Sequence, residues 1–248
     1  MELYGLIGYP LGHSFSAKFF AEKFKTEGID AEYRNFEIKS AAELLEIVKK
    51  HPNLKGLNVT IPYKKDVIPL LDDLSEEARQ IGAVNVISIK RADGQRPFMK
   101  GYNSDIIGFM RSISPLLKPW HKKALVLGTG GASLAVIHGL EKLGIDTTYV
   151  SRTPKAGRLT YGGLSAETME EYKLIVNCTP LGMYPKTNAC PDIPYESIGN
   201  QHLLYDLVYN PEETLFLKKG KDHGATIKNG LEMLHLQALA GWEFWHKD

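Results

Sequence analysis

The chain has 248 residues, 43% of them hydrophobic and 24% charged, and a formal net charge of +1. This composition predicts one large or two ordinary domains with packed cores, and the balanced charge argues against nucleic-acid binding. The two cysteines, Cys178 and Cys190, lack the spacing of a metal or redox site, which predicts free thiols in the cytoplasm and no metal. The first residues include no basic region, so we expect no signal peptide. The apolar stretches are too short for a membrane span.

Strand and helix patterns alternate through the first hundred residues. Strands are predicted at 3–10, 31–38, 56–60, 83–90 and 98–103, the last two as a hairpin turned by DGQ. Helical patterns are predicted at 16–28, 41–50, 64–71 and 75–81, with Ser40 as a helix cap and Glu43 at its capping-box position. This order of elements favours an α/β domain with a mixed or parallel sheet covered by helices.

A second α/β series begins near residue 104. Its predicted elements are a helix at 104–117, a strand, glycine turn and helix at 123–144, strands at 147–152, 173–179 and 202–209, and an amphipathic helix at 230–245. We expect two domains, residues 1–103 and 104–229, with the segment 230–248 packing back on the first.

The glycine turn LVLGTGGAS places Gly128, Gly130 and Gly131 between a buried strand and a helix. Glycine permits the tight turn and lets backbone N–H groups approach a pyrophosphate at the helix N-terminus. Ser133 replaces the third glycine of the dinucleotide-binding fingerprint with another small residue. The strand before and the helix after favour a dinucleotide site over a purely structural turn.

The end of the next strand discriminates between cofactors. An NAD site usually carries an acidic residue there, which holds the ribose 2′-hydroxyl. This chain instead has Ser151, Arg152 and Thr153, followed by Lys155 and Arg158, and no acid. A guanidinium with hydroxyl donors suits a 2′-phosphate, so we expect NADP, the alternative being a solvated basic loop.

Small polar residues follow the first predicted strand, in GYPLGHSFSAK. Ser14 and Ser16 lie at the start of a helix, where free N–H groups favour anions. One serine alone would be interpreted as a helix cap. The pair predicts a site for a carboxylate or phosphate.

Further polar residues lie at the other strand ends of this half. Asn58 and Thr60 end the third strand, Lys64 follows, Asn85 lies on the fourth, and Asp105 opens the bridging helix. Ligands of open α/β sheets bind beyond the carboxyl ends of strands. A lysine there can accept a hydroxyl proton if burial lowers its pKa, and a nearby aspartate would orient it. The alternatives are an exposed lysine, a turn-forming asparagine and a helix-capping aspartate.

Taken together, these segments closely resemble shikimate dehydrogenase, from residue 5 to about 240. The resemblance rests on nine stretches in order: GYPLGHSFS (8–16), NVTIPYK (58–64), GAVNV (82–86), GYNSD (101–105), GTGGA (128–132), SRT (151–153), NCTPLGM (177–183), DLVYNP (206–211) and GLEMLHLQA (230–238). It implies a substrate domain followed by a Rossmann-like, doubly wound NADP domain. It also implies interconversion of shikimate and 3-dehydroshikimate in aromatic amino-acid biosynthesis.

The resemblance further implies roles for single residues. Lys64 and Asp105 form the catalytic pair, Ser14 and Ser16 hold the substrate carboxylate, and Tyr209 lies beside substrate and nicotinamide. The substrate hydroxyls are held by Asn58, Thr60, Asn85, Asp105 and Gln237. The cofactor site comprises Gly128, Gly130, Gly131, Ala132, Ser151, Arg152, Thr153, Lys155, Thr179, Leu207 and Gly230.

Several positions depart from the family pattern. Ser151 replaces an asparagine, and Ala156 stands where a basic residue is usual, so the 2′-phosphate clamp is altered, with Lys155 or Arg158 as the candidate substitutes. The segment between Thr153 and the strand at 173 is short, which predicts that one element is trimmed. The rival interpretations are a quinate/shikimate dehydrogenase using both cofactors and a non-catalytic shikimate sensor. The sequence leaves the oligomeric state open, with a homodimer as one alternative.

Overall fold

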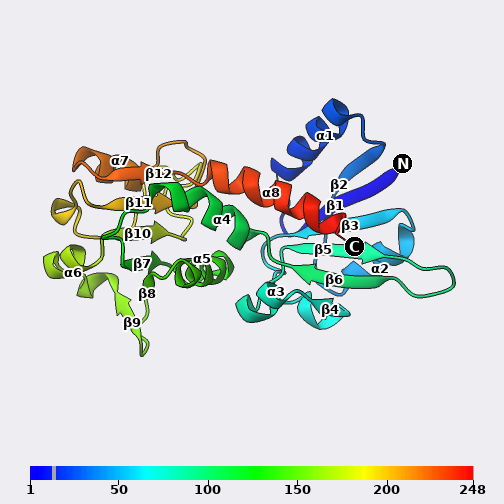
Figure 1. The fold of residues 1–248 in the computed structure, drawn as a ribbon, viewed down its shortest axis with the longest axis horizontal. Coiled ribbons are helices and arrows are strands. Elements are labelled where there is room, and N and C mark those ends of the chain that lie inside the picture. Colours follow the sequence, from blue (N-terminus) through cyan, green and yellow to red (C-terminus); the bar gives the residue numbers. More distant parts are fainter. Residues whose placement is uncertain (13–14, 248) are drawn as a thin grey trace. The chain divides into compact units, whose positions relative to one another are not determined.

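The computed structural model describes residues 1–12 and 15–247 of the chain. Contacts divide it into two compact units, Met1–Ser104 with Ala238–Asp248, and Asp105–Gln237 (Figure 1). Helix α8, Leu231–Trp245, contributes residues to both units. Each unit contains a six-stranded sheet with helices, so the predicted α/β class is confirmed.

The first unit has a mixed sheet in the order β2-β1-β3-β5-β6-β4. Its strands are β1 Glu2–Gly8, β2 Ala31–Glu37, β3 Leu54–Val59, β4 Asp73–Leu74, β5 Val86–Lys90 and β6 Phe98–Tyr102; its further helices are α1 Phe15–Glu27, α2 Glu43–Lys50 and α3 Glu76–Ile81. Strand β1 pairs in parallel with β2 and β3, whereas β5 is antiparallel to both β3 and β6. The predicted hairpin is therefore confirmed.

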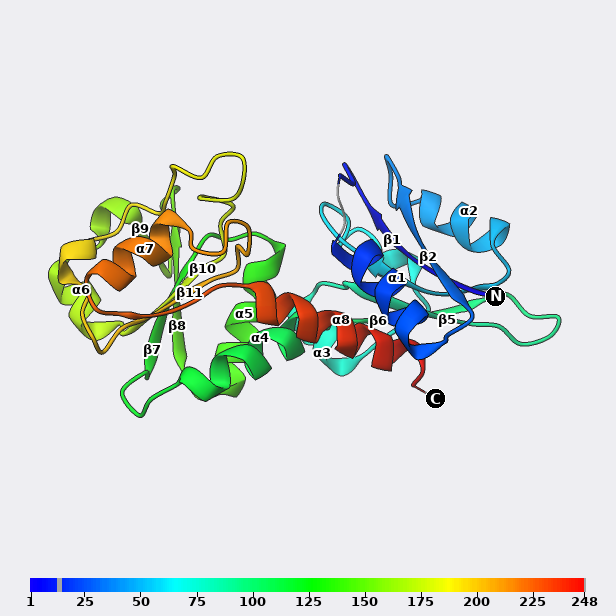
Figure 2. The same cartoon turned by 90° about the horizontal axis from the view of Figure 1, so that it is seen from above.

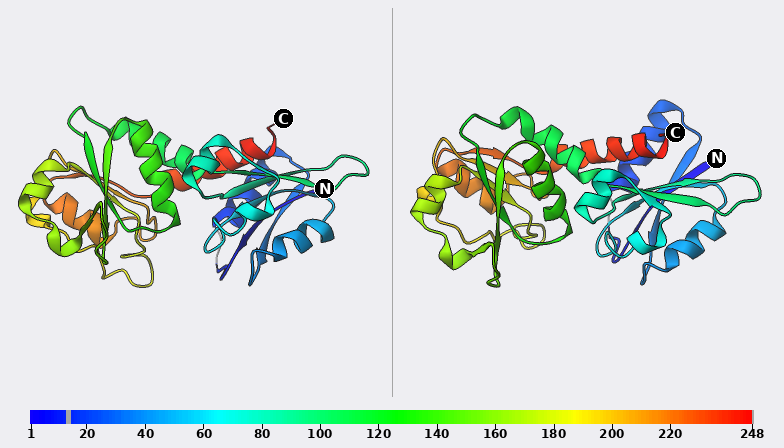
Figure 3. Two further views of the ribbon diagram at one scale, coloured as in Figure 1. Left: turned by 90° about the horizontal axis from the view of Figure 1, so that it is seen from below. Right: turned by 60° about the horizontal axis from the view of Figure 1, so that its bottom comes forward.

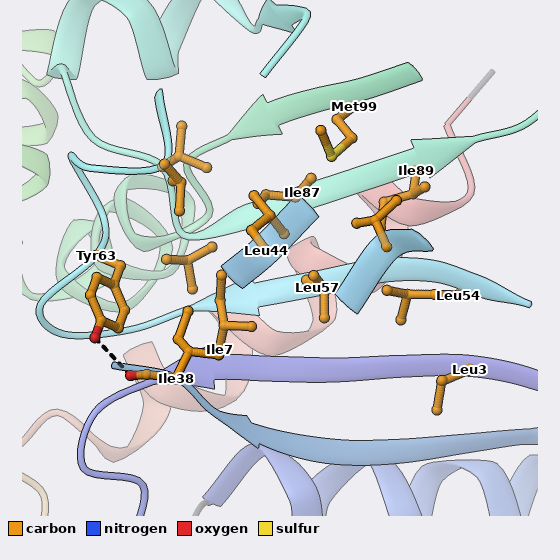
Figure 4. Packing of buried hydrophobic residues seen from close by; sticks show 14 of the residues in the cluster. Leu3, Ile7, Ile38, Leu44, Leu54, Leu57, Tyr63, Ile87, Ile89 and Met99 are labelled. Atoms are coloured by element: carbon orange, nitrogen blue, oxygen red, sulfur yellow. Dashed lines mark hydrogen bonds between the residues drawn. The ribbon is translucent and has the colours of Figure 1, made fainter. Parts of the chain in front are cut away.

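Two hydrophobic clusters cover opposite faces of this sheet, because successive side chains of a strand point to opposite sides. On β1, Leu3 and Ile7 join the cluster with Leu44 of α2 (Figure 4). Tyr4 joins the aromatic cluster with Phe20 of α1 and Trp245 of α8. Figure 3 shows α2 on one side of the sheet and α1 with the end of α8 on the other.

The second unit has an entirely parallel sheet in the order β12-β11-β10-β7-β8-β9. Its elements are α4 Asp105–Ile113, β7 Lys123–Leu127, α5 Gly131–Lys142, β8 Asp146–Ser151, β9 Arg158–Thr160, α6 Ala166–Glu171, β10 Leu174–Asn177, β11 Leu203–Asp206, α7 Leu215–Asp222 and β12 Thr226–Lys228. The chain starts in the middle of the sheet and builds outward in both directions, which is the doubly wound, Rossmann-like order. This part of the prediction is confirmed.

Helices cover both faces of the second sheet, as its apolar strands require. Val126 of β7 packs in the cluster with Phe109 of α4 and Val136 of α5. Its neighbour Leu125 packs on the opposite face with Met169 of α6 and Phe216 of α7. Figure 2 shows these two pairs of helices on opposite sides of the strands.

Two predicted helical features were wrong. Residues 61–67 form turns, followed by a 3-10 helix at Ile68–Leu70. Buried Tyr63 and Val67 have helical spacing, but Pro69 lacks the N–H that an α-helix would need there. Helix α2 begins only at Glu43, and its cap Ala42 makes no side-chain hydrogen bond. Part of the predicted capping does form, since Ser40 Oγ accepts from the backbone N–H of Ala42 at 3.4 Å and Glu43 Oε1 accepts from the Ser40 N–H at 2.9 Å.

The short segment after Thr153 contains both a strand and a helix, but they are small. Residues 152–157 connect β8 directly to its parallel neighbour β9 without a helix. Parallel neighbours usually need a longer crossover, so the shortening falls on this connection. Helix α7 and strands β4, β9 and β12 were not predicted, and each of these strands has only two or three residues.

Within the described residues, no helix is long and apolar enough to cross a membrane.

Candidate active site

Polar side chains gather in the first sheet at the carboxyl end of strand β3. Strand β3 ends there, and the antiparallel strand β5 begins there after Asn85. Asn58 is 5% exposed and Asn85 is 3% exposed. The Asn85 carbonyl accepts from the Val59 N–H at 2.9 Å and from Asn58 Nδ2 at 3.4 Å. The two predicted substrate residues are therefore neighbours.

Tyr33, which the sequence analysis missed, connects Asn58 with another predicted residue, Ser16. Its hydroxyl donates to Asn58 Oδ1 at 2.8 Å, and its phenol is hydrogen-bonded to Ser16. Burial raises the pKa of Tyr33, so the phenol keeps its proton and donates. With Oδ1 accepting this bond, the Asn58 amide turns its N–H group away from Tyr33. The alternation of strand 31–38 places Tyr33 on a face but does not identify its partner.

The Asn85 amide is held from the other side by Ser104. Asn85 Nδ2 donates to Ser104 Oγ at 3.0 Å, and Asn85 Oδ1 accepts from the Ser104 N–H at 2.7 Å. Ser104 thus holds the Asn85 amide with both its hydroxyl and its backbone N–H. Asn103 is used locally, since its Nδ2 donates to the Ala83 carbonyl at 3.0 Å.

Thr60 and Lys64 lie in the turn after β3. Thr60 packs against Gly8, where an added Cβ would lie 2.4 Å from Thr60 Cγ2. Lys64 is half-buried, and its carbonyl accepts from the Val84 N–H at 2.7 Å. The preceding residue, Tyr63, donates its hydroxyl to the Ile38 carbonyl at 2.7 Å (Figure 4). These bonds anchor the backbone on both sides of the lysine side chain.

The remaining predicted substrate residues are distributed as follows. Ser14 lies outside the described residues. Asp105, Tyr209 and Gln237 belong to the second unit. Asp105 is the first residue of α4 and is 8% exposed, Tyr209 is 38% exposed, and Gln237 Nε2 donates to the Leu234 carbonyl at 3.0 Å. The pairing of Asp105 with Lys64 stays a prediction.

The glycine turn of the second unit joins β7 to α5. Gly128 has φ +96°, and an added Cβ would lie 2.8 Å from Thr179 Cγ2, so glycine is needed there. Gly130 caps α5, which begins at Gly131 and continues through Ala132. Ser133 is buried, and its hydroxyl donates to the Gly130 carbonyl at 2.7 Å. No side chain of the described residues caps α5 by a hydrogen bond. The Ser133 N–H donates to the Gly130 carbonyl at 3.1 Å, and the start of the helix before it can receive an anion.

A pocket of about 360 Å³ opens over this turn. It is lined by Gly128, Thr129, Gly130, Ser151, Arg152, Tyr161, Cys178, Thr179, Pro180 and Leu181. Residues that were predicted from three separate stretches, the glycine turn, the end of β8 and the segment after β10, thus share one cavity. Backbone N–H groups and a guanidinium in the same pocket suit a phosphate-bearing ligand.

Among the described residues, six predicted cofactor residues do not line this pocket: Gly131, Ala132, Thr153, Lys155, Leu207 and Gly230. The Thr153 carbonyl accepts from Ser151 Oγ at 2.6 Å. Arg158, considered as a substitute for the missing basic residue, lies with its guanidinium carbon 5.1 Å from the Tyr149 ring centroid. Arg152 is therefore the cation that the structure places in the pocket.

Tyr161 and Cys178 are pocket residues that sequence reasoning missed. Tyr161 follows β9, a three-residue strand that the pattern did not reveal. Its pKa is raised by burial, and Arg152, which lines the same pocket, acts in the opposite direction. Burial also raises the pKa of the Cys178 thiol, so this thiol is neutral.

Among residues 1–12 and 15–247, no group of three or more histidine, cysteine, aspartate or glutamate side chains is placed to hold a metal ion.

Comparison with known proteins identifies the family. Residues 6–87 match the model of the shikimate dehydrogenase substrate binding domain. The chain is 38% identical to the shikimate dehydrogenase (NADP(+)) of Clostridium beijerinckii, over 100% of this chain and 93% of the relative.

Solved structures agree with this assignment. The crystal structure of shikimate dehydrogenase from Aquifex aeolicus superposes with a TM-score of 0.86 at 34% identity, covering 100% of this chain and 93% of that one. The Thermus thermophilus enzyme in complex with NADP(H) and shikimate superposes with a TM-score of 0.84 at 30% identity, covering 99% and 93%. The chain thus belongs to the shikimate dehydrogenase (NADP(+)) family.

Proposed function

We propose that this protein is an NADP-dependent oxidoreductase that interconverts shikimate and 3-dehydroshikimate in aromatic amino-acid biosynthesis. The observation that carries the proposal is the pocket of the second unit, where Gly128, Gly130 and Arg152 line one cavity at the carboxyl ends of a parallel sheet. This is where open α/β sheets bind nucleotides. The ordered amides of the first unit support a polyhydroxylated substrate.

Each predicted residue has a role in this proposal. Ser14 and Ser16 hold the substrate carboxylate. Tyr209 lies beside the substrate and the nicotinamide. The substrate hydroxyls bind Asn58, Thr60, Asn85, Asp105 and Gln237.

Lys64 handles the proton of the reaction, with Asp105 as the second member of the catalytic pair. When shikimate is oxidised, Lys64 accepts the proton of the reacting hydroxyl, and in the reverse direction it returns a proton to the ketone oxygen. Bound NADP supplies the hydride acceptor for this chemistry. The anchored backbone around Lys64 supports its role, because a proton-transfer group must keep its geometry.

The alternative function is a quinate/shikimate dehydrogenase that uses both cofactors, and Arg152 in the cofactor pocket argues against it. Arg152 lines the pocket, whereas Lys155 and Arg158 are not among its lining residues. A 2′-phosphate held by one guanidinium gains less than one held by two. We therefore expect the protein to prefer NADP over NAD, but by a smaller factor than a site in which two cationic side chains bind the 2′-phosphate. A cytoplasmic location and a homodimer stay predictions.

The test is absorbance at the reduced-nicotinamide band, with purified protein, shikimate, and either NADP or NAD. Faster reduction of NADP supports the proposal. Comparable rates with both cofactors, or activity on quinate, favour the dual-specificity enzyme. Shikimate binding without any reduction would favour the non-catalytic sensor and contradict the proposal.

A further inference from the structure

A buried carboxylate to which the proposed reaction assigns no role lies at the end of β11. Asp206 is 0% exposed. Its Oδ1 accepts from Asn177 Nδ2 at 2.9 Å and from the Val208 N–H at 3.0 Å, and its Oδ2 accepts from Thr214 Oγ1 at 2.6 Å. The carboxylate holds all three donor groups in one arrangement. Without it, these buried donors would have no acceptor, which costs free energy.

The first branch of this network reaches the cofactor pocket. Asn177 Oδ1 accepts from the Thr179 N–H at 3.0 Å and from Thr179 Oγ1 at 2.6 Å. Thr179 lines the pocket, and its methyl group packs against Gly128 of the glycine turn. The Asp206 carboxylate therefore fixes the Asn177 amide, and the amide fixes the pocket wall.

The second branch holds the backbone after β11. The Val208 N–H binds Asp206, and the Leu207 N–H donates to the Asn177 carbonyl at 3.0 Å. Gly230 lies against this segment, because an added Cβ would be 2.2 Å from the Leu207 carbonyl oxygen. The Gly230 N–H also donates to the Val208 carbonyl at 3.2 Å. Leu207 and Gly230 were both predicted to contact the cofactor.

The third branch closes the loop between β11 and α7. Thr214 Oγ1 donates to Asp206 and accepts from the Leu217 N–H at 3.4 Å, capping α7. The loop 207–213 is thus held at both ends, by Val208 and by Thr214, through the same carboxylate.

We propose that Asp206 is a positioning residue for the cofactor, which holds Thr179, Leu207 and Gly230 in the geometry that NADP requires. The inference rests on the proposed function, since it assumes that NADP occupies this site. Asp206 acts through Asn177, Val208 and Thr214 and need not touch the ligand.

The experiment is calorimetric titration of the full-length protein with NADP alone, for the wild type and for Asp206→Asn. Asparagine has nearly the same size as aspartate, but one of its two acceptor oxygens becomes an NH₂ donor. That donor then faces Asn177, Val208 or Thr214, each of which donates to Asp206 in the wild type. We expect NADP affinity to fall on the order of tenfold to a hundredfold, and KM for NADP to change more than kcat. Affinity within twofold of the wild type in a folded variant would overturn the inference.

The matched control is Tyr205→Phe on the same strand. It removes another buried hydrogen bond, at 2.6 Å to Ser112 of α4, from a side chain that packs on the other face of the sheet. If this variant loses thermal stability but keeps NADP affinity, the loss in Asp206→Asn comes from positioning. Equal losses of affinity in both variants would overturn the inference.

Thr214 provides a second pair of variants in case Asp206→Asn does not fold. Thr214→Val removes one donor and keeps the shape, whereas Thr214→Ser keeps the hydroxyl. We expect weaker NADP binding in the first and near-normal binding in the second. Identical binding by both would contradict the inference. A wild type that fails to bind NADP would overturn this inference together with the proposed function, whereas the other contrary outcomes overturn the inference alone.

Discussion

The two units each contain a buried polar network, and the networks differ in charge. In the first unit, Tyr33, Asn58, Asn85 and Ser104 connect through neutral hydroxyls and amides. In the second, Asn177 and Thr214 converge on the carboxylate of Asp206. Neutral groups keep their hydrogen bonds over a wide pH range, whereas a buried carboxylate depends on its ionisation.

The networks also differ in what they present to a ligand. The first orients side-chain amides, which match individual hydroxyl groups of a small substrate. The second holds loops and a glycine turn, whose backbone N–H groups match phosphates whatever the neighbouring side chains are. We therefore expect truncated side chains to impair the first unit, and added methyl groups to impair the second.

The largest effect is expected for Lys64→Ala, which removes a side chain of the first unit. We predict a fall in kcat of roughly 10²- to 10⁴-fold, the usual contribution of a general acid–base group. NADP affinity, measured by titration, should remain near the wild-type value. Lys65→Ala is the control, because Lys65 is its exposed neighbour. Near-full kcat in Lys64→Ala would contradict the assigned role.

Asp206 should make the stability of the second unit depend on pH. Its pKa is raised from 3.8 to about 6, first by burial, with the hydrogen bonds from Thr214, Val208 and Asn177 acting in the opposite direction. A raised pKa in the folded state contributes stability that is fully present below about pH 4 and is lost as the pH rises through about 6. The loss corresponds to roughly 3 kcal/mol at most.

This expectation is tested by the unfolding free energies of the wild type and Asp206→Asn near pH 4 and near pH 7. The difference between them should shift in favour of the variant as the pH rises. Cys178 and Tyr195 also interact electrostatically with Asp206, but burial raises the pKa of both, so they stay neutral in this range. If the difference in unfolding free energy between the two proteins is the same at both pH values, the network around Asp206 does not depend on ionisation, and the proposed contrast with the first unit is wrong.

Gly130→Ala tests whether the second unit binds through its backbone. An added Cβ at Gly130 meets no described atom within 4 Å, so the unfolding midpoint should hardly change. If a pyrophosphate approaches this backbone, the methyl group will weaken NADP affinity on the order of tenfold. Gly199→Ala, which is equally open, is the control. Unchanged NADP affinity in Gly130→Ala would place the phosphates elsewhere.

The smallest effect is expected for Tyr33→Phe, which deletes one hydroxyl from the neutral network. Loss of the bond to Asn58 should cost about 1 kcal/mol, which appears as roughly a fivefold rise in KM for shikimate with little change in kcat. Tyr195→Phe removes a similar buried bond in the second unit, to the Pro191 carbonyl at 2.7 Å, and should leave KM for shikimate unchanged. Equal effects in both variants would mean that Tyr33 acts only on stability.

Local patterns were sufficient for much of the fold. Leu57 and Val59, which alternate with Asn58 and Thr60, predicted the third strand, and the continuous apolar run 124–127 predicted a strand buried on both faces. The glycine turn at 128–131 was also predictable from local sequence, because the φ of +96° at Gly128 is one that glycine adopts readily and other residues rarely do. The apparent helix at 64–71 failed, because the burial of Tyr63 and Val67 comes from packing rather than from helical periodicity.

Patterns among neighbouring residues were enough to predict the α/β class, the nucleotide turn and the stretches that carry polar groups, whereas the doubly wound half was expected from the family resemblance. Only the tertiary structure decided that Tyr33 meets Asn58, that Arg152 rather than Arg158 lines the pocket, and that Asp206 holds Thr179 through Asn177. These contacts join residues on different strands and loops. Their pairing is set by strand order and register, which no local pattern specifies.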